Sequence, residues 1–281
     1  GSGDCCAPKL LQYAYKNELQ PLALGEFWWG SAPDKEVRQH KYFYPSCASR
    51  CRPILGHMLQ GLDVEQNPLL TFGQDKPMPV VYEDDDLVVV NKPAGLLSVP
   101  GVEIEDSALT RIKNLYPNAT GAILLHRLDM STSGLLMFTL NPKANKRMQR
   151  QFIKRQVQKT YIADVEGVVA NNHGIIDLPL APDYYDLPRQ MVCDKTGKAS
   201  ETHWSVITRS KSTTRLALKP ITGRTHQLRV HCAHPEGLGM PMVGDELYGV
   251  IGERLHLHAH KLEFTHPTSK EFITIEAPVD F

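Results

Sequence analysis

A short polar stretch in the middle of the chain carries the residue types that catalysis most often requires. It reads His126-Arg127-Leu128-Asp129-Met130-Ser131-Thr132-Ser133-Gly134. Arg127 and Asp129 are two residues apart, which in an extended loop places their side chains on the same side. An aspartate in this basic segment should be ionised at neutral pH, since its reference pKa is about 3.9. The stretch indicates either a catalytic carboxylate beside an arginine or a loop whose Asp and Ser side chains cap a turn.

The order of these residues excludes a protein-kinase catalytic loop. That loop would need His-Arg-Asp-Leu with a later Asn, together with a glycine-rich loop and an Asp-Phe-Gly motif. Here the leucine precedes the aspartate, and the other parts are absent from the sequence.

Two apolar segments flank the polar stretch and must position it. Residues 123–125 (Ile-Leu-Leu) precede it and residues 135–138 (Leu-Leu-Met-Phe) follow it, and both have the composition of buried strands. Gly134, at the junction, permits a backbone turn that other residues resist. We therefore predict a loop held between two strands.

Composition limits the class of protein. The chain has 281 residues and a formal net charge of zero. No apolar run approaches the roughly 20 residues that a membrane span requires, and the first residues show no basic-then-apolar signal pattern. We expect a protein without a membrane partner that acts in the cytoplasm.

The charges are unevenly distributed, although their sum is zero. Between Asp129 and Asp164 there is no acid, and from Arg189 to Arg229 nine Lys or Arg residues accompany only two acids. A neutral chain can therefore present a basic face to a nucleic acid, or these residues can simply be solvated. The first interval contains Lys143, Lys146, Arg147, Arg150, Lys154, Arg155 and Lys159.

Residues 1–78 differ from the rest of the chain and are predicted to form an N-terminal extension. It is rich in aromatic residues and has two short helical segments, at 8–19 and 53–62, and a proline-containing linker follows at 67–79. Cys47 and Cys51 have a spacing that suits two ligands of one zinc ion, and Cys5 and Cys6 could complete the set, with His40 or His57 as the alternative fourth ligand. Buried reduced thiols are the other interpretation.

Residues 79–281 alternate between short strands and a few helices. Strands are predicted at 80–82, 87–90, 160–165, 200–207, 215–218, 256–264 and 272–275, and helices at 106–115 and 142–155. Asn141-Pro142 is a typical helix start, and the helix that follows is basic on its outer faces. Because the pattern is not a strict strand–helix alternation, it predicts an α+β domain with a mixed, mainly antiparallel sheet.

Four motifs, in order, resemble those of the RluA-type pseudouridine synthases. They are Asn91-Lys92-Pro93-Ala94-Gly95, the His126–Gly134 stretch with Leu135-Leu136, Lys159-Thr160-Tyr161-Ile162-Ala163, and Thr222-Gly223-Arg224-Thr225-His226-Gln227-Leu228-Arg229-Val230-His231. The resemblance covers about the last 200 residues. Residues 98–101 and 277–281 look closest to the A-type subgroup, which modifies a large-subunit rRNA loop and a tRNA anticodon stem-loop.

The resemblance implies a reaction and a role for each site residue. Uridine in RNA would be isomerised to pseudouridine, with no catalytic cofactor. Asp129 would act at the ribose as nucleophile or as base, and Arg229 would pair with it. Tyr161 would stack on the uracil. Arg127 would fill the space that the flipped uridine leaves, or hold the displaced base. A structural zinc remains the only metal expected, because the resemblance offers none at the histidine clusters 226–234 and 256–260.

Two other functions compete with this one. A catalytically idle RNA-binding module would not need Asp129, Tyr161 and Arg229 together. A carboxylate-dependent nucleoside hydrolase usually needs a second acid for the leaving group, and none is evident near the motif. We expect a monomer that binds rRNA, tRNA or both.

Overall fold

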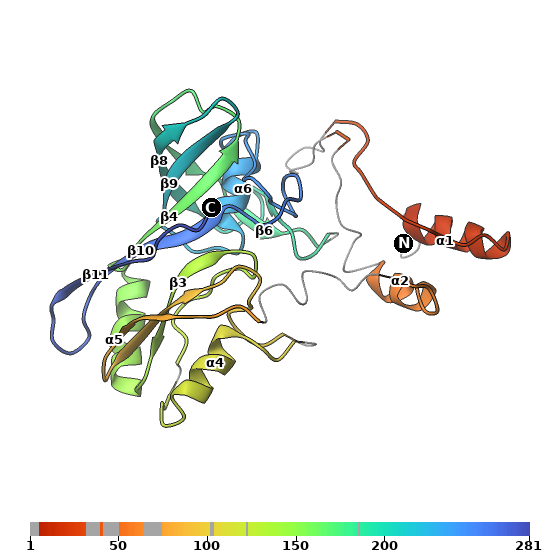
Figure 1. The fold of residues 1–281 in the computed structure, drawn as a ribbon. Helices are drawn as coiled ribbons and strands as arrows, with labels where there is room; N and C mark the ends of the chain where they lie inside the picture. The colour runs from red at the N-terminus through yellow and green to blue at the C-terminus, as the bar shows by residue number, and fades with distance from the viewer. Residues whose placement is uncertain are drawn as a thin grey trace.

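The computed structural model describes residues 6–31, 40–41, 51–64, 75–101, 104–121, 123–184 and 186–281. In this part of the chain nine strands form one sheet in the order β1-β2-β3-β10-β4-β9-β8-β5, with β11 paired to the second half of β10 (Figure 1). The short strands β6 and β7 form a separate hairpin. The sheet strands are β1 (Val80–Glu83), β2 (Leu87–Lys92), β3 (Ser133–Thr139), β4 (Gln158–Glu166), β5 (His173–Asp177), β8 (Glu201–Arg209), β9 (Thr213–Pro220), β10 (Leu257–Thr265) and β11 (Phe272–Glu276).

The α+β class and the mainly antiparallel sheet are confirmed. Every pairing in the sheet is antiparallel except that of β3 with β10. The predicted helices correspond to α1 (Cys6–Lys16), α2 (Arg52–Met58), α4 (Ala108–Leu115) and α5 (Pro142–Ile153). The sequence patterns did not predict β5, the β6–β7 hairpin (Leu180–Pro182 and Gln190–Val192) or α6 (Gln227–Ala233).

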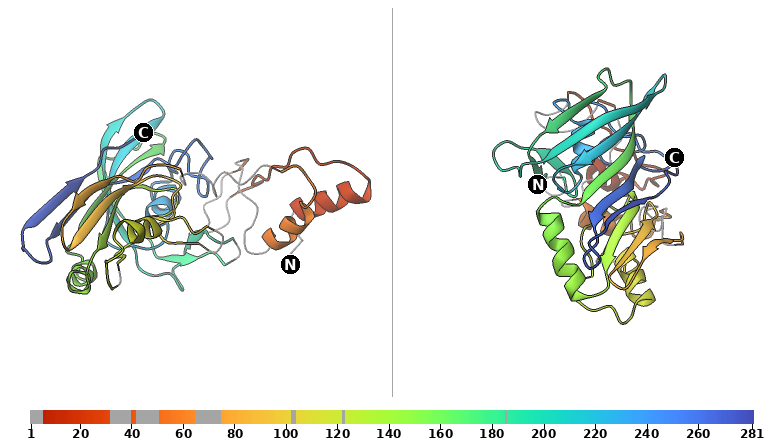
Figure 2. Two further views of the ribbon diagram at one scale, coloured as in Figure 1. Left: turned by 60° about the horizontal axis from the view of Figure 1, so that its bottom comes forward. Right: turned by 90° about the vertical axis from the view of Figure 1, so that its left-hand side faces the viewer.

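The apolar core lies on both faces of the sheet. On one face Ala108 and Ile112 of α4 pack with the cluster that contains Val88, Phe138 and, from α6, Leu228. On the other face Met148 of α5 packs with a cluster that includes Leu87, Val89, Leu135 and Met137. Consecutive residues of β2 and β3 therefore alternate between two buried surfaces, which explains their unbroken apolar runs. Figure 2 shows α5 lying along the sheet.

The prediction of a strand at 123–125 was wrong. This segment joins the sheet only through an isolated antiparallel bridge between Leu124 and Phe138, with the Thr139 amide donating to Ile123 O at 2.8 Å. β10 pairs with β3 only at Ser133 and Gly134, so the segment lies along the rest of that edge. No full ladder forms there, because the Met137 amide donates to the side chain of His126, at 3.2 Å, and not to a backbone carbonyl. The segment leads into the polar stretch.

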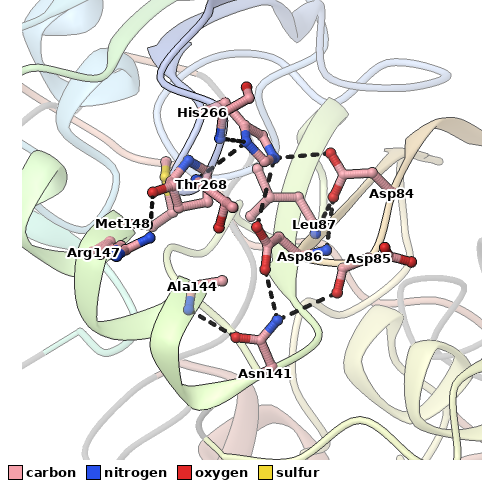
Figure 3. A network of polar contacts seen from close by, with 12 residues as sticks. Asp84, Asp85, Asp86, Leu87, Asn141, Ala144, Arg147, Met148, His266 and Thr268 are labelled. Atoms are coloured by element: carbon pink, nitrogen blue, oxygen red, sulfur yellow. Dashed lines mark hydrogen bonds and ion pairs between the residues drawn. The ribbon is translucent and has the colours of Figure 1, made fainter.

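A polar network fixes the start of α5 (Figure 3). Asn141 caps the helix by accepting from the Ala144 amide at 2.9 Å, and its Nδ2 donates to Asp86 Oδ1 at 2.8 Å. His266, between β10 and β11, forms an ion pair with Asp84 at 2.9 Å. Burial opposes ionisation of Asp84 and Asp86, but their hydrogen bonds and His266 lower the pKa of both carboxyls. The network ties three segments together and so sets where the other end of α5 lies.

The described parts of the N-terminal extension lie apart from the sheet. The helices α1 and α2 run beside each other, and the hydroxyl of Tyr15 in α1 donates to the carbonyl of Met58 in α2 (Figure 1). Cys51 is buried just before α2, whereas Cys6 at the start of α1 is exposed. Cys5 and Cys47 of the predicted zinc site lie outside the described residues.

Candidate active site

One open cleft of about 1030 Å³ brings together all four predicted site residues. Arg127 and Asp129 come from the loop before β3, Tyr161 from β4 and Arg229 from α6. The rest of the lining includes the last turn of α5 and the segment 219–228 between β9 and α6. The site is therefore assembled from segments that lie about 100 residues apart in the sequence.

Asp129 is held between two backbone clamps. On one side, Ser98 Oγ donates to Leu128 O at 2.7 Å and accepts from the Leu128 amide at 3.0 Å. On the other side, Met130 O accepts from the Gly95 amide at 2.8 Å and from Lys92 Nζ at 3.1 Å. Both clamps come from residues 92–98, at the end of β2 and in the loop that follows, so this motif positions the loop that carries Asp129. Fixing both neighbours of a reactive side chain is how a protein pre-organises it.

Lys92 makes its clamp from a fully buried position. Burial lowers the pKa of Lys92 to about 7, opposed by the charge of Asp129. Its Nζ donates to three carbonyl oxygens, those of Pro93, Leu96 and Met130, at 3.0, 2.7 and 3.1 Å. Three acceptors match the three protons of an ammonium group, so we assign Lys92 as charged.

Gly134 does not form a turn, as the sequence suggested, but lies in β3 with a φ of +110°. A Cβ at this position would lie 2.4 Å from the carbonyl oxygen of Ala259 in β10. Only glycine permits this close parallel approach of β3 and β10 directly after the loop 126–132.

Replacing Ser98 by alanine is expected to lower kcat about tenfold to a hundredfold, because a small misplacement of Asp129 is costly to the reaction. The amide and carbonyl of Leu128 would lose their side-chain partner, at a cost of about 1–3 kcal/mol in stability. Ser107→Ala is the matched control, since it removes the buried hydroxyl that accepts from the Thr110 amide at the start of α4. It should lower the melting temperature but leave kcat unchanged; an equal kcat loss in both variants would contradict a positioning role for Ser98.

Tyr161 lies in the middle of β4, opposite Ala259 of β10 and Leu218 of β9. Its side chain is 8% exposed and lines the cleft. Burial, reinforced by the charge of Asp129, raises the pKa of the Tyr161 phenol well above its ordinary value. The tyrosine therefore offers the cleft a neutral aromatic ring at physiological pH.

Arg229 does not pair with Asp129 as expected from the family resemblance. Its Nε and Nη2 donate to the two carboxylate oxygens of Asp245 at 2.9 and 2.5 Å, and Nη2 lies 3.1 Å from Glu246. The fork geometry of a guanidinium fits one carboxylate in this bidentate manner, and Asp245 takes that place. Burial opposes ionisation of Arg229, but the charges of Asp245, Glu246 and, more weakly, Asp129 raise its pKa. Arg229 therefore interacts with Asp129 only electrostatically, and Asp245 fixes the position of the guanidinium.

Asp245 is the main site residue that the sequence analysis missed. It is fully buried, and besides Arg229 it accepts from the amides of Leu247 and Tyr248 at 3.0 and 2.9 Å. The only sequence signal for Asp245 is that it follows Val243 and Gly244, and this pattern does not indicate which residue it binds. Glu246, next to it, accepts from Ser131, two residues after Asp129, at 2.7 Å. The Asp245–Glu246 segment thus holds Arg229 and the loop that carries Asp129 together.

The two histidine clusters act as packing and hydrogen-bonding residues. His258 bonds to Ser133 at 2.8 Å, His231 to Thr202 at 2.9 Å, and His226, which lines the cleft, to Tyr248 at 2.8 Å. Burial lowers the pKa of His226, His231 and His258, so these rings are neutral at physiological pH. Within the described residues no group of three or more His, Cys, Asp or Glu side chains is placed to hold a metal ion.

Comparison with known proteins assigns the family. Residues 86–234 match the family described as RNA pseudouridylate synthase. The chain belongs to this family. It is similar to the dual-specificity RNA pseudouridine synthase RluA of Escherichia coli strain K12, with 44% identity over 216 residues, 74% of this chain and 96% of the relative. RluA of Yersinia pestis is 46% identical over 198 residues, 68% of this chain and 93% of that protein.

Solved structures agree with this family assignment. Human RNA pseudouridylate synthase domain containing 1 superimposes with a TM-score of 0.59 at 29% identity, covering 76% of this chain and 86% of that one. Human RNA pseudouridylate synthase domain containing 4 gives a TM-score of 0.57 at 25% identity over 75% of this chain and 90% of that one. The pseudouridine-synthase-like core and the enzyme class expected from the motifs are confirmed: the chain is an RNA pseudouridine synthase. Among the described residues, none of the helices has the length and apolar character that crossing a membrane demands.

Proposed function

We propose that this synthase isomerises uridine to pseudouridine in structured rRNA and tRNA, with Asp129 as the reacting carboxylate. The observation that carries the proposal is the charge of the cleft. Among the described residues that line it, Asp129 is the only acid, whereas Arg127, Arg155, Lys159, Lys219, Arg224 and Arg229 are basic. Such a cleft attracts a phosphate-bearing strand and presents a single carboxylate to it. The names of the RluA relatives call those enzymes dual-specificity, which supports more than one RNA substrate for this chain.

The reaction balances without a cofactor. The bond from N1 of uracil to C1′ of the ribose breaks, the base turns, and C5 bonds to C1′ while the C5 proton is lost and N1 gains one. Asp129 acts at the sugar, either by attacking C1′ or by removing the neighbouring sugar proton, and both roles need the ionised form. The clamps from Ser98 and Lys92 hold it at the reacting bond.

The other cleft residues contact the uracil base or set the charge around Asp129. Tyr161 stacks on the uracil, and the neutral state that burial imposes on its phenol suits a ring contact. Arg229, held by Asp245, adds a fixed positive charge to the cleft that contains Asp129. Arg127 is exposed at the mouth of the cleft and takes the space that the uridine leaves when it flips out of its stack.

The alternative functions are less well supported. A nucleoside hydrolase with two carboxylates would need a second acid beside the reacting bond, and the described lining of the cleft offers none. An idle RNA-binding module would have no use for the two clamps that fix Asp129.

Mapping of pseudouridine in RNA tests the proposal. Total RNA from a strain that lacks the enzyme should, after incubation with the protein, give a carbodiimide-induced reverse-transcription stop at a defined uridine. We expect such stops in large-subunit rRNA and in a tRNA anticodon stem-loop, and none with Asp129→Asn. A preparation that modifies no rRNA or tRNA site would contradict the proposed function, and stops in one RNA class alone would remove the dual specificity.

We further propose that residues 1–78 form an extension separate from the catalytic domain 79–281, and that the enzyme is a cytoplasmic monomer without a membrane partner. The position of α1 and α2 apart from the sheet supports the boundary (Figure 1). The zinc site at Cys5, Cys6, Cys47 and Cys51 stays a prediction, which the zinc content of the purified protein would test. Catalysis itself does not need this metal.

A further inference from the structure

The outward side of α5 carries an unusual combination of residues. Lys146 and Arg150 are exposed one turn apart, and Ile153, at the end of the helix, is 80% exposed. Positions 146, 150 and 153 fall on one side of an α-helix, because residues three and four apart are neighbours on its surface. The buried side, with Ala144, Asn145 and Met148, is opposite. An isoleucine so exposed among cations is not explained by the packing of the sheet.

This side of α5 leads directly into the cleft. Phe152, Ile153 and Arg155 belong to the lining, and the Phe152 ring stacks on His126 with 5.3 Å between ring centroids. Arg127 and Ile153 each follow one member of that stacked pair, and both are exposed and line the cleft. The mouth of the cleft therefore has a cation from the catalytic loop and an apolar side chain from α5.

The contacts that hold α5 in place come from its other side. Arg147 Nη1 donates to Pro267 O at 2.8 Å, Gln151 Nε2 donates to Thr265 O at 2.7 Å, and the Thr265 amide donates back to Gln151 at 3.1 Å. Together with the Asn141 cap, these bonds fix the rotation of the helix about its axis. Lys146, Arg150 and Ile153 are thereby directed outward by a rigid element.

We propose that Lys146, Arg150 and Ile153 form a docking surface for the RNA strand next to the flipped uridine. The surface deepens the proposed function and rests on it. No acid occurs between Asp129 and Asp164, so a phosphate backbone that crosses α5 meets only cations in this segment. When the uridine flips out, the neighbouring base loses the stacking partner on one of its faces. Ile153 packs against that neighbouring base. Apolar side chains hold unstacked bases in this way in other nucleic-acid complexes.

Single-turnover kinetics on an RNA that the wild-type enzyme modifies can separate the two contacts. Lys146→Gln with Arg150→Gln should raise the enzyme concentration for half-maximal rate about tenfold at 0.1 M salt and leave the maximal rate within about twofold. The slope of log affinity against log salt should become shallower by about 1.4–1.8, or 0.7–0.9 for each lost phosphate contact. Ile153→Asn should raise the half-maximal concentration about threefold to tenfold without changing the slope.

Lys113→Gln with Lys211→Gln is the matched control. It removes the same number of charges from exposed positions on α4 and in the turn between β8 and β9, and neither residue lines the cleft. The control should match the wild-type affinity and slope, and all variants should keep the wild-type melting temperature because the altered side chains are exposed.

Two results would overturn the docking surface. One is a wild-type salt slope and affinity in the Lys146/Arg150 variant, which would place the RNA elsewhere. The other is an equal loss in the Lys113/Lys211 control variant, which would reduce the effect to net charge. A wild-type enzyme that modifies no RNA would instead refute the proposed function, so the two failures are distinguishable.

Discussion

Asp129→Asn is expected to lower the rate of pseudouridine formation by about four orders of magnitude, the loss typical of removing a reacting side chain. Asparagine keeps the size of the side chain but cannot attack the ribose or accept its proton. Since Asp129 is only partly buried and its neighbours are held through Ser98 and Lys92, the fold does not depend on its charge. The melting temperature should therefore stay within about 1–2 °C of the wild-type value, as for a substitution of small energetic effect.

RNA binding by the Asp129→Asn variant should be retained or strengthened. The substitution removes the only acid among the described residues that line a basic cleft, so repulsion of the phosphate backbone falls. Fluorescence anisotropy with a labelled substrate RNA, beside a single-turnover assay, measures the two effects separately. Loss of binding in parallel with activity would contradict a purely chemical role for Asp129.

Asp106→Asn provides the control. Asp106 forms a bidentate pair with Arg111, at 2.9 and 2.7 Å, on α4 and away from the lining of the cleft. Its loss should leave turnover at the wild-type level, because a partly exposed ion pair contributes about 0–1 kcal/mol.

Retained turnover in the Asp129 variant would remove Asp129 from its role and reopen the hypothesis of an idle RNA-binding module.

The sequence located the loop that lines the cleft with Asp129 and most of the sheet, because both signals are local. Alternating or continuous apolar runs predicted β2, β4 and β10, and the Asn-Pro pair predicted the start of α5. The segment 123–125 has the same composition as a strand but makes only one bridge to β3, because the side chain of His126 takes the Met137 amide, and composition does not reveal that contact. The parallel pairing of β3 with β10 joins residues about 125 positions apart, and no local pattern predicts it.

Within the site, the partner of Arg229 is likewise a contact that local sequence patterns do not predict. Family resemblance placed Arg229 near Asp129, and both line the same cleft. The hydrogen bonds of Arg229 nevertheless go to Asp245, 16 residues later, in a loop after α6. Which of two nearby carboxylates receives a guanidinium depends on side-chain orientation and burial, and these arise only when the chain packs. A role can therefore be predicted from a motif more readily than the contact that carries it out.

Asp245→Asn is expected to destabilise the protein by about 3 kcal/mol or more, because the buried guanidinium of Arg229 loses its bidentate counter-ion and keeps only the contact with Glu246 at 3.1 Å. The asparagine oxygen can still accept from the amides of Leu247 and Tyr248, but its amide nitrogen would face the N–H groups of Arg229. The side chain of Arg229 is only 2% exposed, so water cannot replace the lost partner. Thermal unfolding should show a loss of roughly 6–20 °C.

Activity should fall as well, in the fraction of the enzyme that remains folded. Without Asp245, the position of Arg229 beside Asp129 is no longer fixed, and the contact of its guanidinium over the Tyr248 ring, at 5.3 Å, is lost. We expect kcat to drop about a hundredfold when it is measured well below the melting temperature. Glu246→Gln is the milder comparison, since its distance to Arg229 is longer at 3.1 Å and a glutamine oxygen can still accept from Ser131.

The pH dependence of stability tests whether the folded protein holds Asp245 as a carboxylate. Burial alone would raise the pKa of Asp245, but Arg229 and the two backbone amides outweigh it and lower the pKa. A carboxyl whose pKa is depressed in the folded state contributes its stabilisation above its unfolded pKa of about 3.9, and loses it as the pH falls further. Urea unfolding should therefore show a wild-type advantage over Asp245→Asn that is constant from pH 7 to about pH 5 and shrinks below pH 4.

The comparison of the two variants at each pH isolates this one carboxyl. The pKa values of Asp84, Asp86 and Asp164 are also lowered by their partners, so the wild-type protein should lose stability in acid at several sites at once. These three carboxyls are present in both proteins, and their contributions cancel in the difference because they lie outside the Arg229 pair. A wild-type advantage that stays constant down to pH 3 would mean that folding does not lower the pKa of Asp245, which would contradict its ion pair with Arg229. Arg229 would then need another group to hold it beside Asp129.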